Sequence, residues 1–104
     1  ECDSMPHWQR VMQGHAAANV MPVIAANRYG LEAVTPSKEN GGQSSSLEFF
    51  GSSFITDETG AILKQAERKG DSVLTQEFDL DEIKTARLDW GLFRDRRPEV
   101  YKEI

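Results

Sequence analysis

The sequence predicts an α/β fold with a strongly twisted sheet. An amphipathic segment over residues 6–19 runs straight into a continuous apolar run, Val20–Ala26, and further extended segments separated by turn residues follow between 47 and 78. A continuous apolar run is typical of a strand that is buried on both faces of its sheet. Such a strand needs layers above and below it, and this chain supplies too few. The fold is therefore predicted to be incomplete alone.

The first predicted element is a helix from Pro6 to Asn19. Asp3 or Ser4 is the expected N-cap, and Pro6 suits the first turn, where its missing N–H costs nothing. Gly14 indicates that another backbone comes close to the helix. Five side chains recur at helical spacing and are expected on one inward face. They are Trp8, Val11, Met12, His15 and Ala18.

The apolar run Val20–Ala26 completes a helix–strand unit over residues 6–28. Pro22 donates no ladder hydrogen bond, so either the strand starts after it or a bulge lies there. Asn27 and Arg28 follow the strand, at the kind of sheet edge where α/β proteins usually bind ligands. Residues 31–46 read as a polar loop, and loops of that length are often functional or mobile.

The second half of the chain contains three short elements and a tail. Residues 47–66 predict a hairpin around the turn at 56–60, in which Gly60 supplies the left-handed residue. Alternation over 72–78 predicts another strand. Asp79 or Asp81 is expected to cap a helix over 81–88. The tail, 90–104, mixes aromatic side chains with three arginines, and it is expected to bury them by lying across another surface.

Composition limits the possible functions. The 104 residues are 38% hydrophobic and 28% charged, which fits a single globular unit. The net charge of −5 argues against nucleic-acid binding and is compatible with a cationic substrate. No apolar run approaches the ~18 residues that a membrane span requires. The single cysteine favours a reducing, cytoplasmic setting. The abrupt start without Met indicates truncation or processing.

Three stretches of sequence carry a resemblance. The segments HWQRVMQGHAAANVMPVIAANRYG (7–30), FFGSSFITDETGAIL (49–63) and WGLFRDRRPEVY (90–101) resemble the nitrilase, or carbon–nitrogen hydrolase, superfamily, and within it the N-carbamoylputrescine amidases. The resemblance implies that residues 1–104 are the C-terminal portion of a four-layer α-β-β-α sandwich. It also implies that the catalytic Cys, Glu and Lys of the family lie upstream of this segment.

The same resemblance implies a reaction and partners. The whole enzyme would hydrolyse N-carbamoylputrescine, a small cationic carbamoyl amine, to putrescine, carbon dioxide and ammonia, with no metal or organic cofactor. The C-terminal tail would contact a second subunit of a homo-oligomer. Two alternatives stay open. One is another carbamoyl-amide hydrolase of the β-ureidopropionase kind, and the other is a non-catalytic binding or assembly module.

Five residues are candidates for lining the substrate pocket: His7, Trp8, Asn27, Arg28 and Ser53. The resemblance places His7, the Asn-Arg pair and the Gly-x-Ser containing Ser53 near the active site, with Ser53 as a hydrogen-bonding wall and not a nucleophile.

No catalytic residue is predicted within this sequence. Cys2 is flanked by Glu1 and Asp3, and their negative charge disfavours a thiolate. The two histidines are eight residues apart with no further ligand on their face, so no metal site is expected. His15 is expected to be a core residue.

Overall fold

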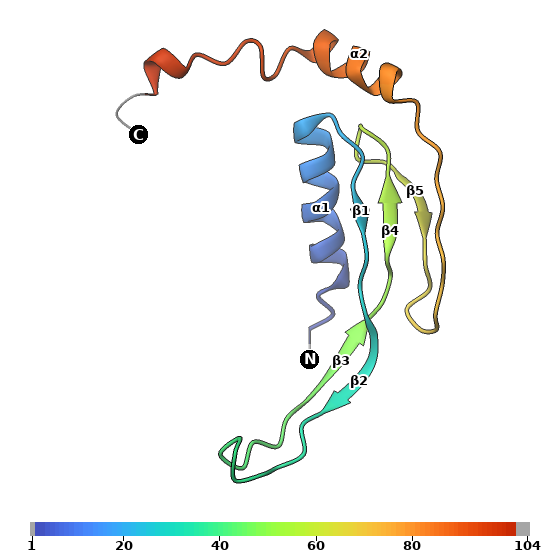
Figure 1. Ribbon diagram of the computed structural model, residues 1–104, viewed down its shortest axis with the longest axis vertical. Helices are drawn as coiled ribbons and strands as arrows, with labels where there is room; N and C mark the ends of the chain where they lie inside the picture. Colours follow the sequence, from blue (N-terminus) through green and yellow to red (C-terminus); the bar gives the residue numbers. More distant parts are fainter. Residues whose placement is uncertain (1, 102–104) are drawn as a thin grey trace.

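The computed structural model describes residues 2–101, which form two small antiparallel sheets with a helix at each end of the chain (Figure 1). Helices and strands are mixed, which confirms the α/β class. The elements are α1 (Met5–Asn19), β1 (Ile24–Ala25), β2 (Tyr29–Ala33), β3 (Ser46–Phe50), β4 (Phe54–Thr56), β5 (Ile62–Gln65), α2 (Leu80–Trp90) and the 3-10 helix η1 (Pro98–Val100).

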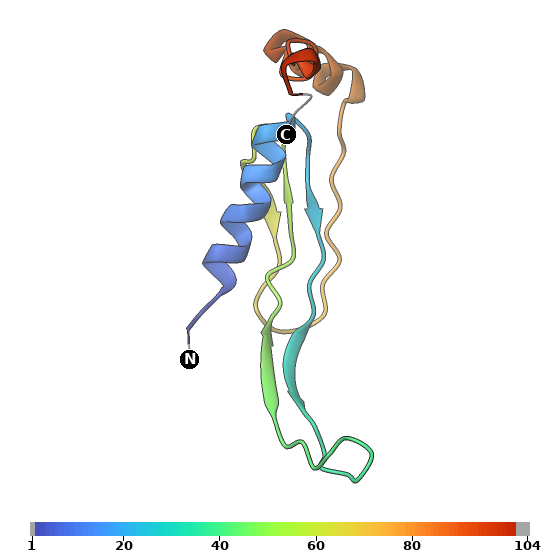
Figure 2. The same cartoon turned by 90° about the vertical axis from the view of Figure 1, so that its left-hand side faces the viewer.

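Strand β4 is the centre of the larger sheet, whose order is β1-β4-β5. Both pairings are antiparallel, with Ile24 opposite Ile55 and Phe54 opposite Gln65. All three residues of β4 are buried. Helix α1 lies alongside this sheet, whereas α2 lies beyond its end (Figure 2). The strand around which the chain is organised is therefore β4, and not the earlier apolar run.

The core lies between α1 and β4. Its buried apolar residues are Ala16, Val20, Ala25, Phe54 and Ile55. The Trp8 ring meets the edge of Phe54 at a centroid distance of 5.2 Å and is tilted against Phe50 at 5.4 Å. Aromatic pairs in this geometry add about 0.5–1.5 kcal/mol beyond their area burial. These contacts fix the N-terminal half of α1 on the sheet.

The inward face of α1 differs from the predicted one. Val11, His15 and Ala18 are exposed, so the prediction of a core histidine is wrong. Ala16 is fully buried instead, and the half-buried Gln13 donates its amide N–H to the carbonyl of Gly60 at 2.9 Å. Because this hydrogen bond satisfies the glutamine amide, a polar side chain can face the sheet, and apolar periodicity alone misplaces the face.

The close backbone contact of α1 involves Gly60 and not Gly14. Gly60 has φ of +85°, and a Cβ atom there would lie 2.6 Å from the carbonyl oxygen of Gln13. A Cβ atom at Gly14 would meet nothing within 4 Å. The left-handed turn predicted at Gly60 is thus confirmed, whereas the contact predicted at Gly14 is wrong.

The apolar run Val20–Ala26 is not a strand buried on both faces. Val20 has φ of +49° and ends α1 in the left-handed conformation, and the N–H of Met21 donates back to Ala16 at 3.1 Å. The strand starts after Pro22, which was one of the two alternatives. It is only two residues long, and Ile24 is 70% exposed. The first half of the run cannot join the strand, because Val20 ends the helix and Pro22 lacks the N–H that a sheet ladder needs.

The predicted loop over 31–46 is confirmed for residues 34–45, but both of its ends continue into paired strands that form an arm. Strands β2 and β3 pair from Tyr29 opposite Phe50 to Ala33 opposite Ser46, and only residues 34–45 form a loop at the tip. The arm projects away from the body (Figure 1). Gly51–Ser53 then separates β3 from β4, so the strand predicted from residue 47 onward is broken at its centre.

The strand predicted over 72–78 is also absent. This segment is extended and runs back beside β5 (Figure 1), yet no ladder joins the two. The Lys64 side chain donates to the carbonyl of Thr75 instead, and Val73 is 90% exposed. Alternation supplied the pattern of a strand, but the backbone lacks a hydrogen-bonded partner among the described residues.

Helix α2 begins where a cap was predicted. The Asp79 carboxylate accepts hydrogen bonds from the N–H groups of Asp81 at 3.0 Å and Glu82 at 3.1 Å. Gly91 ends the helix with φ of +63°. No residue of α2 is buried, so local capping, and not packing, defines this helix.

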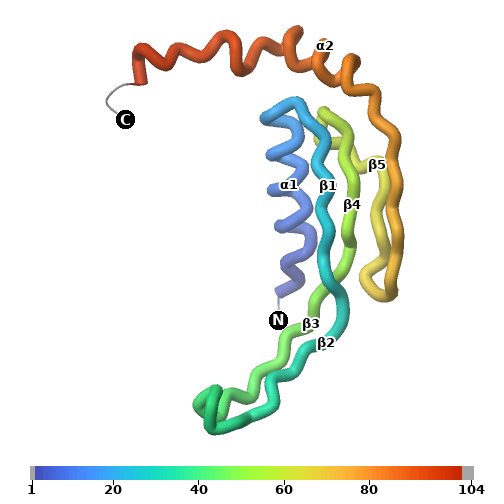
Figure 3. Tube along the Cα trace, in the orientation of Figure 1, coloured from blue at the N-terminus to red at the C-terminus, as the bar shows by residue number. Residues whose placement is uncertain are grey.

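The described chain is elongated. Its radius of gyration is 19.3 Å, whereas a compact chain of about 100 residues has about 13 Å. Helix α2 and the tail extend across one end, away from the three-stranded sheet (Figure 3). None of the helices in the described region is long and apolar enough to cross a bilayer.

Candidate functional site

A polar cavity of about 340 Å³ lies where the arm joins the body. It is bordered by the segment after β1, the break between β3 and β4, and the turn after β5. The lining residues are Asn27, Tyr29, Gly51, Ser52, Ser53, Ala66, Glu67, Gly70, Asp71 and Ser72. Two of the five predicted pocket residues, Asn27 and Ser53, line this cavity together.

Asn27 and Ser53 are joined directly by hydrogen bonds. The Asn27 backbone N–H donates to Ser53 Oγ at 2.8 Å, and Ser53 Oγ–H donates back to the Asn27 carbonyl at 3.3 Å. The Asn27 side-chain amide donates to the Gly51 carbonyl at 2.9 Å. These three bonds replace the ladder between β1 and β4 where it stops. They hold the cavity wall in a fixed geometry.

The corner beside Asn27 is built from two left-handed residues, Gly51 with φ of +55° and Ser52 with φ of +58°. Ser52 is buried, and its hydroxyl donates to the Phe50 carbonyl at 2.9 Å. A Cβ atom on Gly51 would lie 2.7 Å from the carbonyl oxygen of Arg68. A non-glycine residue in this region is uncommon and costs free energy that the surroundings must offset.

The opposite wall of the cavity carries a hydroxyl and two carboxylates. Tyr29 donates its phenolic O–H to Asp71 at 3.0 Å, and this hydrogen bond to a carboxylate raises the pKa of Tyr29. Glu67 is the second acidic lining residue, and none of the lysines and arginines within residues 2–101 lines the cavity. The site therefore presents oxygen acceptors and negative charge, which suit a small hydrogen-bond donor or a cation.

The other three predicted residues lie elsewhere. His7 is exposed on the first turns of α1, and Trp8 packs against Phe50 and Phe54 in the core. Arg28 stacks over the Phe49 ring at 4.3 Å and forms an ion pair with Glu32 on the arm. None of the three lines the polar cavity, and their pocket-lining roles stay predictions.

The described residues contain no arrangement for nucleophilic or metal chemistry. Cys2 is exposed, and no hydrogen bond joins it to a histidine or carboxylate within residues 2–101. Its neighbour Asp3 pairs with Arg68 at 2.6 Å, and hydrogen bonding to this guanidinium lowers the pKa of Asp3. No set of three potential metal ligands gathers in the described part of the chain.

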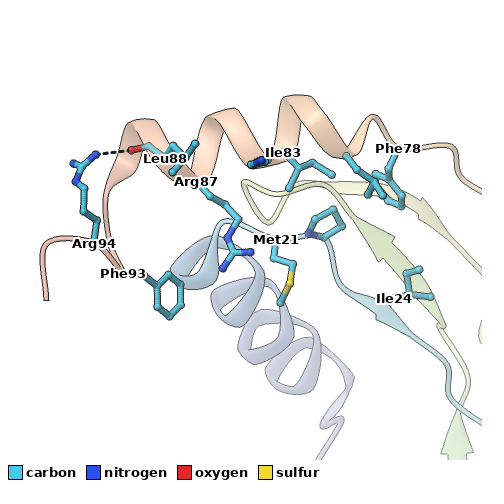
Figure 4. A pocket seen from close by; sticks show the side chains of 11 residues that line it. Met21, Ile24, Phe78, Ile83, Arg87, Leu88, Phe93 and Arg94 are labelled. Carbon is cyan, nitrogen blue, oxygen red and sulfur yellow. Dashed lines mark hydrogen bonds between the residues drawn. The ribbon is translucent and has the colours of Figure 1, made fainter. Parts of the chain in front are cut away.

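A second, apolar groove of about 540 Å³ runs between α2 and the start of β1. Ile83 and Leu88 lie on α2 above the groove, Met21 and Ile24 lie below it, and Phe93 lies at one side (Figure 4). Arg94 closes one end by donating to the Leu88 carbonyl at 3.1 Å. The groove exposes the apolar side chains that a complete fold would cover.

Sequence reasoning missed the acidic wall of the polar cavity. None of Asp71, Glu67 and Tyr29 was predicted to line a pocket. The available signal was the short spacing between the turn at 68–71 and the strand before it, which brings Asp71 back towards the arm. The Gly-Ser-Ser break inside an apolar strand pointed to the corner itself.

The described residues thus place a helix on an antiparallel sheet and a polar cavity at a left-handed Gly-Ser corner. The model of the carbon-nitrogen hydrolase family matches residues 1–88. The chain therefore belongs to the carbon–nitrogen hydrolase family, which confirms the resemblance found in the sequence.

Particular relatives narrow the comparison. The chain is 56% identical over 102 residues to an N-carbamoylputrescine amidase of Oryza sativa and 53% identical to a citrullinase of Francisella tularensis, covering 98% of this chain and 33% of each relative. A crystal structure of a carbon-nitrogen hydrolase from Helicobacter pylori G27 superposes with a TM-score of 0.75 at 34% identity, covering 96% of this chain and 32% of that one. The chain thus spans about a third of the length of the relatives it matches.

Proposed function

We propose that this chain is the C-terminal portion of an N-carbamoylputrescine amidase. The whole enzyme would add one water to the carbamoyl group of N-carbamoylputrescine and release putrescine, carbon dioxide and ammonia, a step of putrescine synthesis. The observation that carries this proposal is identity of 49–56% to N-carbamoylputrescine amidases from four plants over 102 residues. That identity extends over the corner and cavity described above.

The charge of the polar cavity supports a cationic substrate. Putrescine and its carbamoyl derivative carry an ammonium group at neutral pH, and such a group is bound by carboxylates and carbonyl or hydroxyl oxygens. Asp71, Glu67 and Tyr29 supply groups of this kind on one wall. In this proposal Asn27 and Ser53 hold the cavity wall in place. His7 and Arg28 contact either the substrate or the catalytic groups, and those catalytic groups belong to residues outside this chain.

The bond-breaking groups lie outside these 104 residues in this proposal. The family's Cys attacks the carbamoyl carbon, its Glu transfers protons, and its Lys stabilises the oxyanion. Cys2 lacks a partnered base and takes no part. The segment contributes pocket wall and sheet, and no metal or organic cofactor is required.

Location and assembly are parts of the same proposal. A single exposed cysteine suits a reducing compartment, so we place the enzyme in the cytoplasm. The tail exposes Trp90, Phe93 and Tyr101 to solvent, and we assign it to contacts with a second subunit of a homo-oligomer. Exposed aromatic side chains of this kind are enriched in subunit interfaces.

The proposal is tested by assaying the 104-residue chain and the longer gene product side by side on N-carbamoylputrescine, with ammonia release as the readout. We expect turnover by the longer protein only. Turnover by the short chain would place the chemistry on these residues and bring Cys2 back as the nucleophile, and a Cys2→Ala variant would decide that directly.

Citrulline is the informative competing substrate because a relative named citrullinase is 53% identical. Citrulline carries the same carbamoyl group, but it bears a carboxylate as well as an ammonium at the far end of the molecule. Repulsion by Asp71 and Glu67 should disfavour it. We expect a higher kcat/KM for N-carbamoylputrescine, and the opposite preference would reassign the substrate within the same family.

A further inference from the structure

The loop at the tip of the arm, residues 34–45, is organised around a single asparagine. Asn40 Oδ1 accepts hydrogen bonds from the backbone N–H groups of Ser37 at 3.0 Å and Gln43 at 3.1 Å. Its side-chain amide donates to the Thr35 carbonyl at 2.9 Å. The next residue is Gly41, which is exposed and has φ of +68°.

These contacts have a chemical consequence. The nitrogen of the residue after an asparagine can attack the side-chain carbonyl carbon, and glycine hinders this attack least because it has no Cβ. Nothing lies within 4 Å of where a Cβ on Gly41 would be, so no packed neighbour confines this residue. Its N–H donates to the Lys38 carbonyl at 3.3 Å, a long hydrogen bond that must open before the nitrogen can attack. Two N–H groups already point at Oδ1, which is the atom that becomes negatively charged during the attack. Preorganised donors of this kind stabilise an oxyanion.

We propose that Asn40 is a site of self-catalysed deamidation, in which the Ser37 and Gln43 N–H groups stabilise the oxyanion. The Gly41 nitrogen gives its proton to water and bonds to Asn40 Cγ, and Nδ2 takes a proton from water and leaves as ammonia when the Cγ–Nδ2 bond breaks. The cyclic imide that results is opened by water at either carbonyl. Opening leaves aspartate or isoaspartate at position 40, with no oxidation or reduction.

The product changes the arm. A carboxylate at position 40 cannot donate to the Thr35 carbonyl, and the two oxygens repel each other. Isoaspartate also adds a backbone methylene at the turn that connects β2 and β3. Both changes weaken the contacts that hold the tip loop between Ala33 and Ser46.

Two other asparagines of the chain serve as internal references for the deamidation rate. Asn19 precedes Val20 and Asn27 precedes Arg28, so their attacking nitrogens belong to bulkier residues. After prolonged incubation of the 104-residue chain, mass spectrometry of its peptides gives the deamidation rate at all three positions. We expect Asn40 to react at least about tenfold faster than either reference, equivalent to a barrier about 1.4 kcal/mol lower. Equal rates would overturn the proposal.

Two glycine variants test whether the reaction depends on glycine at position 41, and a peptide tests whether it depends on the folded arm. Gly41→Ala should slow the reaction, whereas Gly42→Ala, also at positive φ with open space around it, should leave the rate nearly unchanged. A peptide of residues 33–46 keeps the Asn-Gly pair but lacks the arm that fixes the donors. Faster deamidation in the folded chain than in the peptide supports the oxyanion role. An equal or slower rate in the folded chain, or equal rates in the two glycine variants, contradicts it.

Discussion

The body around β4 and the region around α2 are built in opposite ways. Phe54 and Thr56 on β4 are fully buried, and Ala16 of α1 closes over them. Helix α2 buries no residue, and Leu80, Leu88 and Trp90 are 76%, 56% and 69% exposed. The first region buries its central strand within the chain. The region around α2 also carries large apolar side chains, but no part of the described chain covers them.

This difference shows what the segment lacks. A monomer rarely exposes a large continuous apolar patch unless something binds there. The groove is lined by α2 and by Ile24, and Ile24 belongs to β1, the edge strand of the larger sheet. One uncovered apolar surface therefore spans both elements. The relatives are about three times as long as this chain, and we propose that residues outside this segment cover the surface.

Substitution of Phe54 should cause the largest loss in the free energy of unfolding, because this residue lies in the buried region around β4. Phe54→Ala removes a fully buried ring in contact with Trp8, and such changes cost about 3–5 kcal/mol. Urea denaturation followed by Trp8 fluorescence in a Trp90→Phe background measures the loss. The matched substitution Leu80→Ala, at an exposed site, should change the free energy of unfolding by less than about 0.5 kcal/mol. Similar losses for both variants would remove the contrast between the regions.

The close contact between Gly60 and the backbone of Gln13 should help to hold α1 on the sheet. Gly60→Ala adds a Cβ that collides with the backbone of Gln13 and forces alanine into a left-handed conformation, with an expected cost of about 1–3 kcal/mol. Gly70→Ala is the control because it has φ of +89° with no atom nearby. Thermal unfolding should show the larger loss at Gly60. A loss at Gly70 as large would mean that conformational strain, and not the contact, sets the cost.

Capping should dominate the stability of α2. Asp79→Ala removes the acceptor for two N–H groups and should reduce helix stability by about 1 kcal/mol. Far-UV circular dichroism should record less helix, while the urea midpoint reported by Trp8 stays unchanged. Lys84→Ala, in the middle of the same helix, is the control. A shift of the Trp8 midpoint in Asp79→Ala would show that the two regions are coupled.

The smallest expected effect is on the pH at which Tyr29, in the cavity wall, ionises. The bond to Asp71 raises the pKa of Tyr29, so its stabilising contribution is present below the pKa of an unfolded tyrosine and is lost as the pH rises through the higher folded value. Absorbance titration in a Tyr101→Phe background isolates Tyr29. Asp71→Asn should lower the Tyr29 transition. An unchanged transition would remove the hydrogen bond from the description of the site.

The sequence predicted local elements better than their surroundings. Caps and turns such as Asp79 and Gly60 were predictable because neighbouring residues determine them. The buried face of α1 was not, because Gln13 is satisfied by a carbonyl 47 residues away. The strand at 72–78 failed for the same reason, since alternation describes a strand only when a partner backbone is available. Among the residues that line the polar cavity, Asn27 and Ser53 had been singled out through family resemblance, and their role in binding substrate stays a prediction. Asp71 had not been singled out, because the turn that brings it to the cavity is visible only in the three-dimensional structure.

Hydrogen exchange measured on the 104-residue chain and on the longer gene product tests the central claim most directly. Amides of β4 should be protected in both proteins, because this chain alone buries them. Amides of α2 should exchange rapidly in the short chain and become protected in the longer protein. Strong protection of α2 in the isolated chain, equal to that of β4, would contradict the claim that its apolar face is covered by residues outside this segment.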